Sequence, residues 1–434
     1  MGMKVTVIGS GYVGLIAALG FGIKNNKVIC VDKNKEKIKN LKKGIPIIYE
    51  KELDNYLKKC IEDKKITFST DIKKGIRESN IIFIAVGTPP LNNGEVDMTQ
   101  VKEVIRDISK YINEYKVVVN KSTVPIGTQK YMKRMLNNEG ISNEYFDVVS
   151  NPEFLREGKA FEDFFNTDRI VIGYDSEKAK GVMGKLYKNF NRKIVYTNPE
   201  TAELIKYASN GFLATKISFI NEIANLCDEI GGNVEDISYA LGLDKRISPL
   251  FLNAGIGFGG SCFPKDTKAL VKIGEKYGVD FNIIKSTINV NNKQRIIPIK
   301  KLLNYYKDIS GKIISVLGLT FKPGTDDIRE SPAIYIINEL IKNKAKVKCY
   351  DPNVSKTIKD KYPQIEYCNN LYDTFTNSSC AIFCTEWEEF SKLDLFKLKA
   401  KMKEPLIIDG RNIFNYEHIK KAKIKYFAIG RGYI

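Results

Sequence analysis

Short β-branched runs alternate with helical patterns over the first part of the chain. The runs are KVTVIG at 4–9, KVICVD at 27–32, IIFIAVG at 81–87, KVVVNKS at 116–122, FDVVSNPE at 146–153 and RIVIGYD at 169–175. Strands that alternate with helices in this way predict a doubly wound α/β domain with a parallel sheet.

The pattern changes in the middle of the chain. Strand signals vanish from about 198 to 295, and residues 200–232 show the periodicity of one long amphipathic helix that ends at a glycine pair. The strand rhythm resumes near Gly311, with KIISVLGLTF, KVKCYD, SCAIFCTEW and PLIIDGR. We therefore predict two Rossmann-like doubly wound α/β domains joined by a central helical domain with a long spine helix, with boundaries at 1–197, 198–300 and 301–434.

The two α/β parts echo each other. KVTVIGSGYVG leads to KVICVD in the first, and KIISVLGLTFKPG leads to KVKCYD in the second. Both begin with a strand and reach a second strand that ends in aspartate. Because the second copy lacks the full glycine pattern, we expect a different nucleotide there.

Composition narrows the class of protein. The 434 residues carry a formal net charge of +18, but the lysines are interspersed with glutamates and asparagines. A scattered charge is typical of a solvated surface, so we expect no nucleic acid and no membrane as partner. No apolar run approaches the roughly 20 residues that a bilayer requires, and no cleavable apolar segment precedes the first strand. We expect a soluble cytoplasmic protein.

The reactive side chains are limited in kind. The eight cysteines form no metal-binding spacing, several lie in apolar runs, and His418 is the only histidine. This composition predicts reduced thiols and no metal site, and it removes Ser-His-Asp chemistry unless His418 alone is recruited. We expect His418 to be a surface or cap residue. Cysteine, lysine, carboxylates and amides must carry any catalysis.

A glycine-rich turn follows the first strand. Gly9, Gly11 and Gly14 have the GxGxxG spacing, and Asp32 ends the next strand. Such glycines allow a pyrophosphate to approach a helix N-terminus, and the aspartate binds ribose hydroxyls while repelling a 2′-phosphate. The motif predicts NAD as cofactor. A merely structural turn is the alternative.

Polar residues also follow later strands of the first domain. They are Thr88, Thr123, Glu153 and Glu157. Ligands of open α/β sheets lie beyond the carboxyl ends of the strands, so we expect these side chains to line one edge. Taken singly, each could be only a cap or turn residue.

The segment GIGFGGSCFPKDTKALVKIGEKYG at 255–278 holds the strongest candidate nucleophile. Pro264 suits the start of a helix, with Lys265 and Asp266 in its first turn. Cys262 then lies just before a helix N-terminus and beside a lysine, and both features favour the thiolate. Three glycines, at 257, 259 and 260, would let a substrate approach the backbone. The alternative is a structural cysteine in a tight loop.

Lys206 and Asn210 are four residues apart in the predicted long helix and so share one face. A solvated pair is the ordinary explanation. Such a pair of donors could also stabilise an oxyanion.

Together these segments resemble the UDP-glucose/GDP-mannose dehydrogenase family over essentially the whole chain, and GFGGSCFPKDT resembles its UDP-glucose branch most closely. Further matching segments are VIGSGYVG, VGTP, KSTVPIGT, NPEFLREG, DKRI, LTFKPGTDDIRESPA and IDGRN. The resemblance implies an N-terminal NAD domain, a central domain that forms a homodimer and a C-terminal domain that binds UDP.

The resemblance also implies roles for individual residues. Those expected to contact NAD are Gly9, Gly11, Tyr12, Val13, Gly14, Asp32, Lys37, Thr88, Thr123, Glu157, Lys265 and Arg329. Those expected to contact the nucleotide sugar are Glu153, Phe154, Leu155, Glu157, Lys206, Asn210, Phe251, Leu252, Asn253, Gly255, Gly259, Lys322 and Arg411. Arg246 is expected to reach the substrate of a neighbouring subunit.

The implied reaction is a four-electron oxidation of UDP-glucose by two NAD+ and water. The resemblance implies that Cys262 forms a thiohemiacetal and then a thioester, with Lys206 and Asn210 stabilising the alkoxide. Thr123 and Asp266 would hold a water in the first step, and Glu153 would activate the hydrolytic water. GDP-mannose or another nucleotide sugar is the alternative substrate, and a one-step two-electron dehydrogenase is the alternative reaction.

Overall fold

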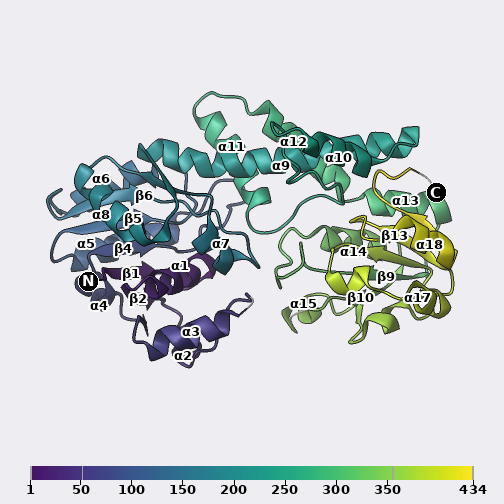
Figure 1. The fold of residues 1–434 in the computed structure, drawn as a ribbon, viewed down its shortest axis with the longest axis horizontal. Helices are drawn as coiled ribbons and strands as arrows, with labels where there is room; N and C mark the ends of the chain where they lie inside the picture. The colour runs from purple at the N-terminus through teal and green to yellow at the C-terminus, as the bar shows by residue number, and fades with distance from the viewer. Residues whose placement is uncertain (1, 51, 354–355, 433–434) are drawn as a thin grey trace. The chain divides into compact units, whose positions relative to one another are not determined.

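The computed structural model describes residues 2–50, 52–353 and 356–432 (Figure 1). The chain divides into two compact units, Met1–Ser209 and Asn210–Ile434. Each unit contains one sheet.

The first unit is built on an eight-stranded sheet in the order β3-β2-β1-β4-β5-β6-β7-β8. Its strands are β1 Lys4–Ile8, β2 Lys27–Val31, β3 Ile66–Ser69, β4 Ile81–Ile84, β5 Lys116–Asn120, β6 Phe146–Ser150, β7 Arg169–Gly173 and β8 Lys193–Thr197. Its helices are α1 Tyr12–Ile23, α2 Lys35–Lys42, α3 Leu53–Glu62, α4 Ile72–Glu78, α5 Thr99–Tyr111, α6 Thr128–Asn138, α7 Ala160–Asn166, α8 Glu177–Tyr187 and the 3-10 turn η1 Lys188–Phe190.

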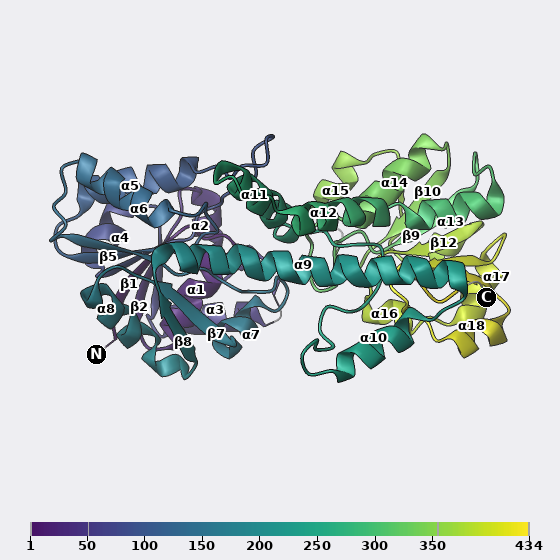
Figure 2. The ribbon, with the colours of Figure 1, turned by 90° about the horizontal axis from the view of Figure 1, so that it is seen from above.

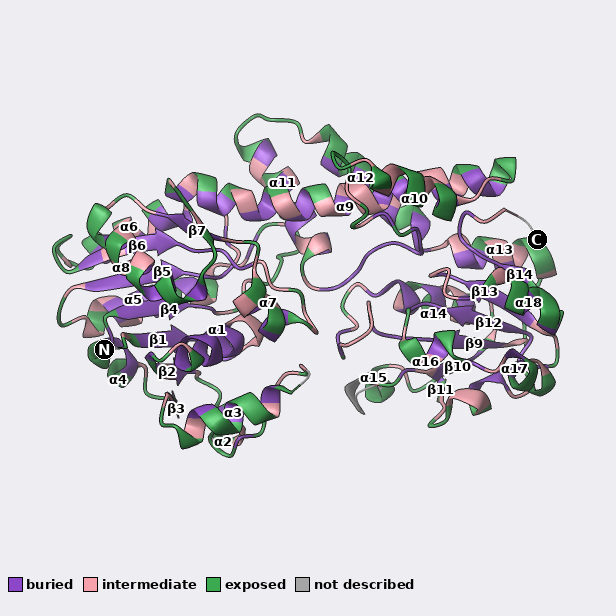
Figure 3. Ribbon diagram, in the orientation of Figure 1, coloured by how far each residue is buried: buried purple, intermediate pink, exposed green. Residues whose placement is uncertain are grey.

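Both faces of this sheet are covered. Ile81 and Phe83 of β4 pack with α1 on one face, and Ile82 and Ile84 pack with α5 and α6 on the other. Continuous apolar strands are typical of a sheet buried on both sides, and Figure 3 shows the inner strands buried.

The predicted α/β class is confirmed, with two differences in detail. The runs noted in the sequence form β1, β2 and β4 to β7, but β3 and β8 were not expected. The parallel pairing also changes once, because β6 and β7 pair antiparallel at Ser150 and Gly173. All other neighbours in this sheet are parallel.

A long helix, α9, runs from Pro199 to Ile230 and crosses the boundary between the units (Figure 2). It ends before Gly231, which has a φ of +72° that favours glycine at a helix C-terminus. The helices that follow are α10 Val234–Leu243, α11 Phe263–Lys276, α12 Asn282–Gln294 and α13 Ile297–Tyr306. The described residues from 198 to 295 contain no strand, as the sequence predicted.

The second sheet is parallel throughout, in the order β11-β10-β9-β12-β13-β14. Its strands are β9 Ile313–Leu317, β10 Lys346–Tyr350, β11 Glu366–Tyr367, β12 Cys380–Phe383, β13 Leu406–Asp409 and β14 Lys425–Phe427. Its helices are α14 Pro332–Lys342, α15 Lys356–Lys361, η2 Leu371–Phe375, α16 Glu388–Ser391, α17 Leu395–Lys401 and α18 Tyr416–Ala422. His418 is exposed on α18.

The internal echo extends to side-chain hydrogen bonds. Asp32 at the end of β2 accepts from the backbone N–H and hydroxyl of Ser10, at 2.9 and 2.7 Å. Asp351 at the end of β10 accepts from the same two groups of Thr320, at 3.1 and 3.2 Å. Only the first copy continues directly into a helix, since β9 is followed by a long loop before α14. The second copy therefore lacks a helix N-terminus for a pyrophosphate at this position.

The described residues contain neither a membrane-spanning helix nor a cluster of metal-ligating side chains. Among them, no helix is both long and apolar enough to cross a membrane. Within the same ranges, no group of three or more histidine, cysteine, aspartate or glutamate side chains is arranged to hold a metal ion.

Candidate functional site

The glycine turn between β1 and α1 fits a dinucleotide pyrophosphate. Gly9 has a φ of +102°, and a Cβ on Gly14 would lie 1.9 Å from the Gly9 carbonyl oxygen. A Cβ on Gly11 would meet nothing within 4 Å, and no side chain caps α1. Gly9 and Gly14 are thus required by the shape of the turn. Gly11, which has no side chain, leaves space for a pyrophosphate to approach the turn. The amides of the first turn, which include those of Tyr12 and Val13, suit an anion.

Asp32 stands at the strand end where a ribose would bind. Partial burial opposes its ionisation, but hydrogen bonds from Ser10 and Asn34 and the charge of Lys37 outweigh it and lower the pKa of Asp32. The Asp32 side chain is therefore a carboxylate at neutral pH, and the positive charge of Lys37 interacts with it. A fixed negative charge at this place disfavours a 2′-phosphate.

Four predicted cofactor residues, Tyr12, Thr88, Thr123 and Glu157, follow strands of the first unit. The Thr88 hydroxyl donates to the Thr123 carbonyl oxygen at 2.8 Å, which joins the loops after β4 and β5. The Tyr12 hydroxyl accepts from the backbone N–H of Gly158. Glu157, next to that glycine, is half-buried. The structure thus places these residues beyond the carboxyl ends of β1, β4, β5 and β6.

Glu153 and Lys206 form a buried ion pair. Lys206 Nζ lies 2.8 Å from Glu153 Oε1, and Glu153 Oε2 accepts from the backbone N–H of Leu155 at 2.6 Å. Burial raises the pKa of Glu153, but the charge and hydrogen bond of Lys206 outweigh it, helped by Leu155 and Lys121, and the pKa lies below its ordinary value. The pair brings together two residues 53 positions apart.

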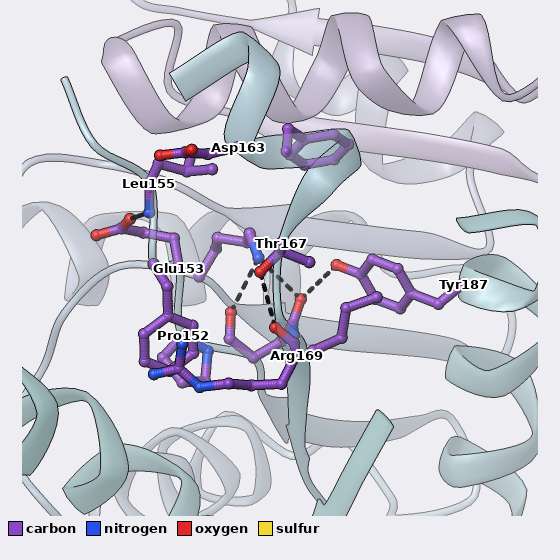
Figure 4. Close-up of a pocket in the computed structure, with 12 residues that line it drawn as sticks. Pro152, Glu153, Leu155, Asp163, Thr167, Arg169 and Tyr187 are labelled. Carbon is purple, nitrogen blue, oxygen red and sulfur yellow. Dashed lines mark hydrogen bonds between the residues drawn. The ribbon is translucent and has the colours of Figure 1, made fainter. Parts of the chain in front are cut away.

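A pocket beside this pair extends toward β7 and α8 (Figure 4). The Arg169 guanidinium carbon lies 3.9 Å from the centre of the Phe154 ring, and Lys206 Nζ lies 5.5 Å from the same centre. The remaining lining residues are Lys121, Asn151, Pro152, Glu153, Leu155, Asp163, Phe164, Thr167, Ile170 and Tyr187. Cationic and amide groups therefore lie beside an aromatic ring and two carboxylates, those of Glu153 and Asp163.

The other donor on α9, Asn210, is also paired with a carboxylate. Its Nδ2 donates to Asp266 Oδ2 at 2.6 Å, and Lys265 Nζ lies 2.5 Å from Asp266 Oδ1. Asp266 is buried. The predicted oxyanion donors Lys206 and Asn210 thus each contact a carboxylate from the predicted catalytic set.

Cys262 is exposed and forms the N-cap of α11, as the sequence predicted. Pro264 is the second helical residue, not the first, since α11 begins at Phe263. The Ser261 hydroxyl lies 3.6 Å from Cys262 Sγ. The adjacent lysine charge is shared with Asp266, so the helix N-terminus is the clearer stabiliser of a thiolate.

The other thiols are placed differently. Six are buried, and Cys368 is intermediate in exposure. Burial raises the pKa of Cys30, Cys349 and Cys380, which keeps these thiols protonated. Among the eight, Cys262 is the one exposed thiol.

The glycines of the Cys262 loop pack closely against neighbouring segments. A Cβ on Gly259 would lie 2.3 Å from the Glu330 carbonyl oxygen, and one on Gly260 would lie 2.7 Å from the Phe321 ring. A Cβ on Gly257 would lie 2.6 Å from Asn291 Oδ1. The loop therefore packs tightly against its own unit. That these glycines also let a substrate approach the backbone stays a prediction.

Buried amides hold this loop, and sequence reasoning missed them. Asn291 accepts from the Phe258 N–H at 2.7 Å and donates to its carbonyl oxygen at 3.0 Å. Gln294 donates to the Gly255 carbonyl oxygen, and Asn221 accepts from the Gly255 N–H, both at 2.8 Å. Polar residues inside a helix normally indicate an exposed face, so no local signal marked them.

The remaining predicted substrate residues lie in the second unit. Arg411 donates to the Gly257 carbonyl oxygen at 3.3 Å and to that of Cys384 at 2.9 Å. The segment from Phe251 through Leu252 and Asn253 leads to Gly255, and Phe251 has a φ of +64°. Lys322 lies in the loop after β9, next to Phe321, whose ring packs against Gly260.

Two predicted arginines are held by neighbouring aspartates. Arg329 pairs with Asp327 at 2.7 Å, and the backbone carbonyl of Arg329 accepts from the Gly260 N–H at 2.8 Å. Arg246 is exposed and pairs with Asp244 at 2.6 Å. Both side chains thus lie at the surface of the second unit.

These features define a class of protein: one with a dinucleotide-binding fold and an exposed cysteine at a helix N-terminus. Family models of the UDP-glucose/GDP-mannose dehydrogenase family match most of the chain. They are its NAD binding domain at residues 3–191, its central domain at 200–293 and its UDP binding domain at 315–416. The chain belongs to the UDP-glucose/GDP-mannose dehydrogenase family and is an NAD-dependent oxidoreductase.

Individual relatives agree over the full length. The chain is 46% identical to the UDP-glucose 6-dehydrogenase TuaD of Bacillus subtilis over 429 residues, which cover 99% of this chain and 93% of the relative. A UDP-glucose dehydrogenase structure from the archaeon Pyrobaculum islandicum matches with a TM-score of 0.93 and 34% identity, covering 100% of this chain and 98% of the other. A UDP-D-ManNAc dehydrogenase structure from Pyrococcus horikoshii matches with a TM-score of 0.89 and 30% identity, covering 100% of both.

Proposed function

We propose that this protein oxidises UDP-glucose twice at C6, with two NAD+ and one water, to give UDP-glucuronate. The observation that carries the proposal is the exposed Cys262 at the N-terminus of α11 in a chain 46% identical to a UDP-glucose 6-dehydrogenase. NAD+ supplies the hydride acceptor. The residues of this chain supply binding, proton transfer and the covalent intermediate.

In this proposal, three regions of the chain have separate functions. Residues 1–197 bind NAD, 198–300 form the central dimerisation domain with the cysteine loop, and 301–434 bind the UDP moiety. The ranges of the three family models support this division. The cofactor and substrate residues are those given by the resemblance above.

The chemistry requires a nucleophile for the aldehyde. A water held by Thr123 and Asp266 takes the C6 hydroxyl proton as the first hydride leaves. The Cys262 thiolate then adds to the aldehyde carbon, and the alkoxide is stabilised by Lys206 and Asn210. Loss of the second hydride gives a thioester on Cys262. Water activated by Glu153 hydrolyses that thioester, which releases the thiolate and the carboxylate.

The number of NADH formed per sugar tests this reaction. With limiting UDP-glucose and excess NAD+, we expect two NADH and one UDP-glucuronate per UDP-glucose, because the covalent aldehyde equivalent stays on the enzyme. Absorbance at the NADH band and chromatography of the nucleotide sugar measure both. A ratio of one would refute the four-electron route.

Other nucleotide sugars are the competing substrates. The similarity to a UDP-D-ManNAc dehydrogenase structure favours including UDP-N-acetylhexosamines beside GDP-mannose in the same assay. The proposal expects UDP-glucose to have the highest kcat/KM. A higher value for another sugar would replace the substrate and keep the mechanism.

We also propose a homodimer that uses the exposed face of α9. Phe212, Phe219 and Leu226 follow at seven-residue intervals and are 66%, 50% and 55% exposed. This spacing puts them on one side of the helix, and a row of exposed apolar side chains favours a protein partner. In this proposal, Arg246 of one subunit reaches the substrate of the other.

A charge on that face is expected to separate the subunits. Phe219→Glu should shift the mass in solution from dimer to monomer, because burying an unpaired carboxylate in an interface is costly. The exposed Phe396 on α17 offers the matched control Phe396→Glu. Light scattering measures both, and a Phe219→Glu dimer as stable as the wild type would contradict the proposed interface.

A cytoplasmic location completes the proposal. None of the eight cysteines forms a disulfide in the structure, and all eight lie within the described residues. Free thiols are typical of a reducing compartment.

A further inference from the structure

Lys121 is a buried lysine at the carboxyl end of β5 that the mechanism above leaves without a role. It is 6% exposed. Its Nζ donates to the carbonyl oxygen of Asn151 at 3.4 Å and to Asn151 Oδ1 at 3.2 Å. Both acceptors are uncharged. A buried ammonium held by neutral oxygens is costly unless a nearby charge compensates it.

That compensating charge is the carboxylate of Glu153. Glu153 lowers the free energy of the Lys121 ammonium, whereas Lys206 raises it. Glu153 already accepts from Lys206 and from the Leu155 N–H. Two buried cations therefore share one buried carboxylate.

The other ionisable groups that line the pocket are already engaged. Asp163 pairs with Arg156 at 2.6 Å, and the Tyr187 hydroxyl donates to Asn151 Oδ1 at 2.6 Å. Arg169 stacks on Phe154 and donates to the Ser209 hydroxyl at 3.2 Å. The charge balance at Glu153 is thus set by Lys121 and Lys206.

We propose that Lys121 is a positioning residue that compensates the charge of Glu153 when Lys206 turns its ammonium toward the substrate alkoxide. The inference rests on the proposed function. Lys206 cannot leave a buried carboxylate without a large electrostatic cost, since a buried charge without its partner is strongly destabilising. A second cation in place beforehand reduces that cost.

The ionisation of Lys121 fits this role. Burial lowers the pKa of Lys121 to about 8, with Lys206 adding to the effect and Glu153 opposing it. The ammonium is therefore present at neutral pH and lost as the pH rises through about 8. As Lys206 moves away, its repulsion falls and the proton on Lys121 is held more firmly.

Kinetics of Lys121→Met and Lys121→Arg test the proposal. Lys121→Met should lower kcat with UDP-glucose at least about tenfold and change KM little, because the lost charge acts only once the alkoxide forms. Lys121→Arg keeps a cation at all working pH values. It should recover part of kcat and move the alkaline limb of the pH profile above that of the wild type.

Lys116→Met is the matched control. Lys116 is buried at the other end of the same strand, where its Nζ donates to the Ser79 carbonyl oxygen at 2.7 Å. The Lys116→Met variant should keep the wild-type kcat and pH profile even if the substitution lowers the stability of the protein. Wild-type kcat and an unchanged alkaline limb in correctly folded Lys121→Met would overturn the proposal, as would an equal loss in Lys116→Met.

A second measurement does not depend on turnover. Between about pH 8 and the ordinary lysine range, the unfolded chain binds a proton at Lys121 that the folded chain has lost. The stability of the wild type relative to Lys121→Met should therefore rise with pH across this window in urea unfolding. Glu153→Gln should move the start of the rise to lower pH, because the compensating charge is gone.

These two readouts separate the possible failures. Absence of turnover by the wild type with UDP-glucose would refute the proposed function, while the unfolding experiment would still report on the coupling of Lys121 to Glu153. The role of Lys121 would be overturned if the stability difference between wild type and Lys121→Met did not change with pH. It would also be overturned if Glu153→Gln did not move the start of the rise to lower pH.

Discussion

Cys262→Ala is expected to lower UDP-glucuronate formation by about 10³-fold or more, as removal of a covalent nucleophile does in other enzymes. Its fold and its binding of UDP-glucose should survive. Cys262 is exposed, so the smaller side chain leaves no buried cavity. NADH absorbance and product chromatography measure the rate, and calorimetry measures binding.

Cys368→Ala is the appropriate control for this substitution. Cys368 is the other thiol that is not buried, and it lies in the second unit as Cys262 does. Its replacement should leave turnover near the wild-type value. Near wild-type production of UDP-glucuronate by Cys262→Ala would refute the thioester mechanism and reduce the loop to a structural role.

The Cys262→Ser variant tests whether activity depends on the chemistry of the thiol or only on the size of the side chain. A serine keeps the size of the side chain, but its hydroxyl has a much higher pKa than a thiol and is a poorer leaving group. Any ester that forms should hydrolyse slowly and accumulate. Mass spectrometry of the intact protein would show it as a sugar-nucleotide adduct.

The fold could be predicted where the signal is local. Strands such as β4 and β5 are buried on both faces, so their branched apolar runs stand out in the sequence. β8, KIVYT, is mostly exposed, and β3 alternates buried and exposed positions over only four residues. Neither makes a continuous apolar run. The antiparallel step at β6 and β7 depends on a long-range pairing that no local pattern records.

The parts of the site that form contiguous motifs could likewise be predicted, whereas its long-range contacts could not. The glycine turn and the Cys262 cap are contiguous motifs, so spacing alone predicted their positions. The Lys206 and Glu153 pair joins residues from a helix and a loop, and Lys121 reaches them from a third element. Such convergence is set by the register of neighbouring strands. A lysine after KVVVN is an unusual end for a buried strand, and that signal could have directed attention to Lys121.

Lys206→Ala is expected to lower kcat by about 10² to 10³-fold, the usual effect of removing one oxyanion donor. The affinity for UDP-glucose should fall less, since the contact strengthens only as the alkoxide develops. The structure adds a second consequence. Lys206 is the main group that holds the pKa of buried Glu153 down, so its loss should raise that pKa and lower the stability of the protein.

The double variant Lys206→Met with Glu153→Gln separates these two effects. It removes both charges of the buried pair but leaves Lys121 without its compensating carboxylate. The fold should therefore regain stability at a pH above about 8, where Lys121 is neutral, while turnover stays low. Urea unfolding and steady-state kinetics compare it with Lys206→Ala. If Lys206→Ala lost affinity for UDP-glucose but kept its turnover at saturation, Lys206 would be a ground-state binding residue. The alkoxide would then have to be stabilised by Asn210, whose amide is held by Asp266.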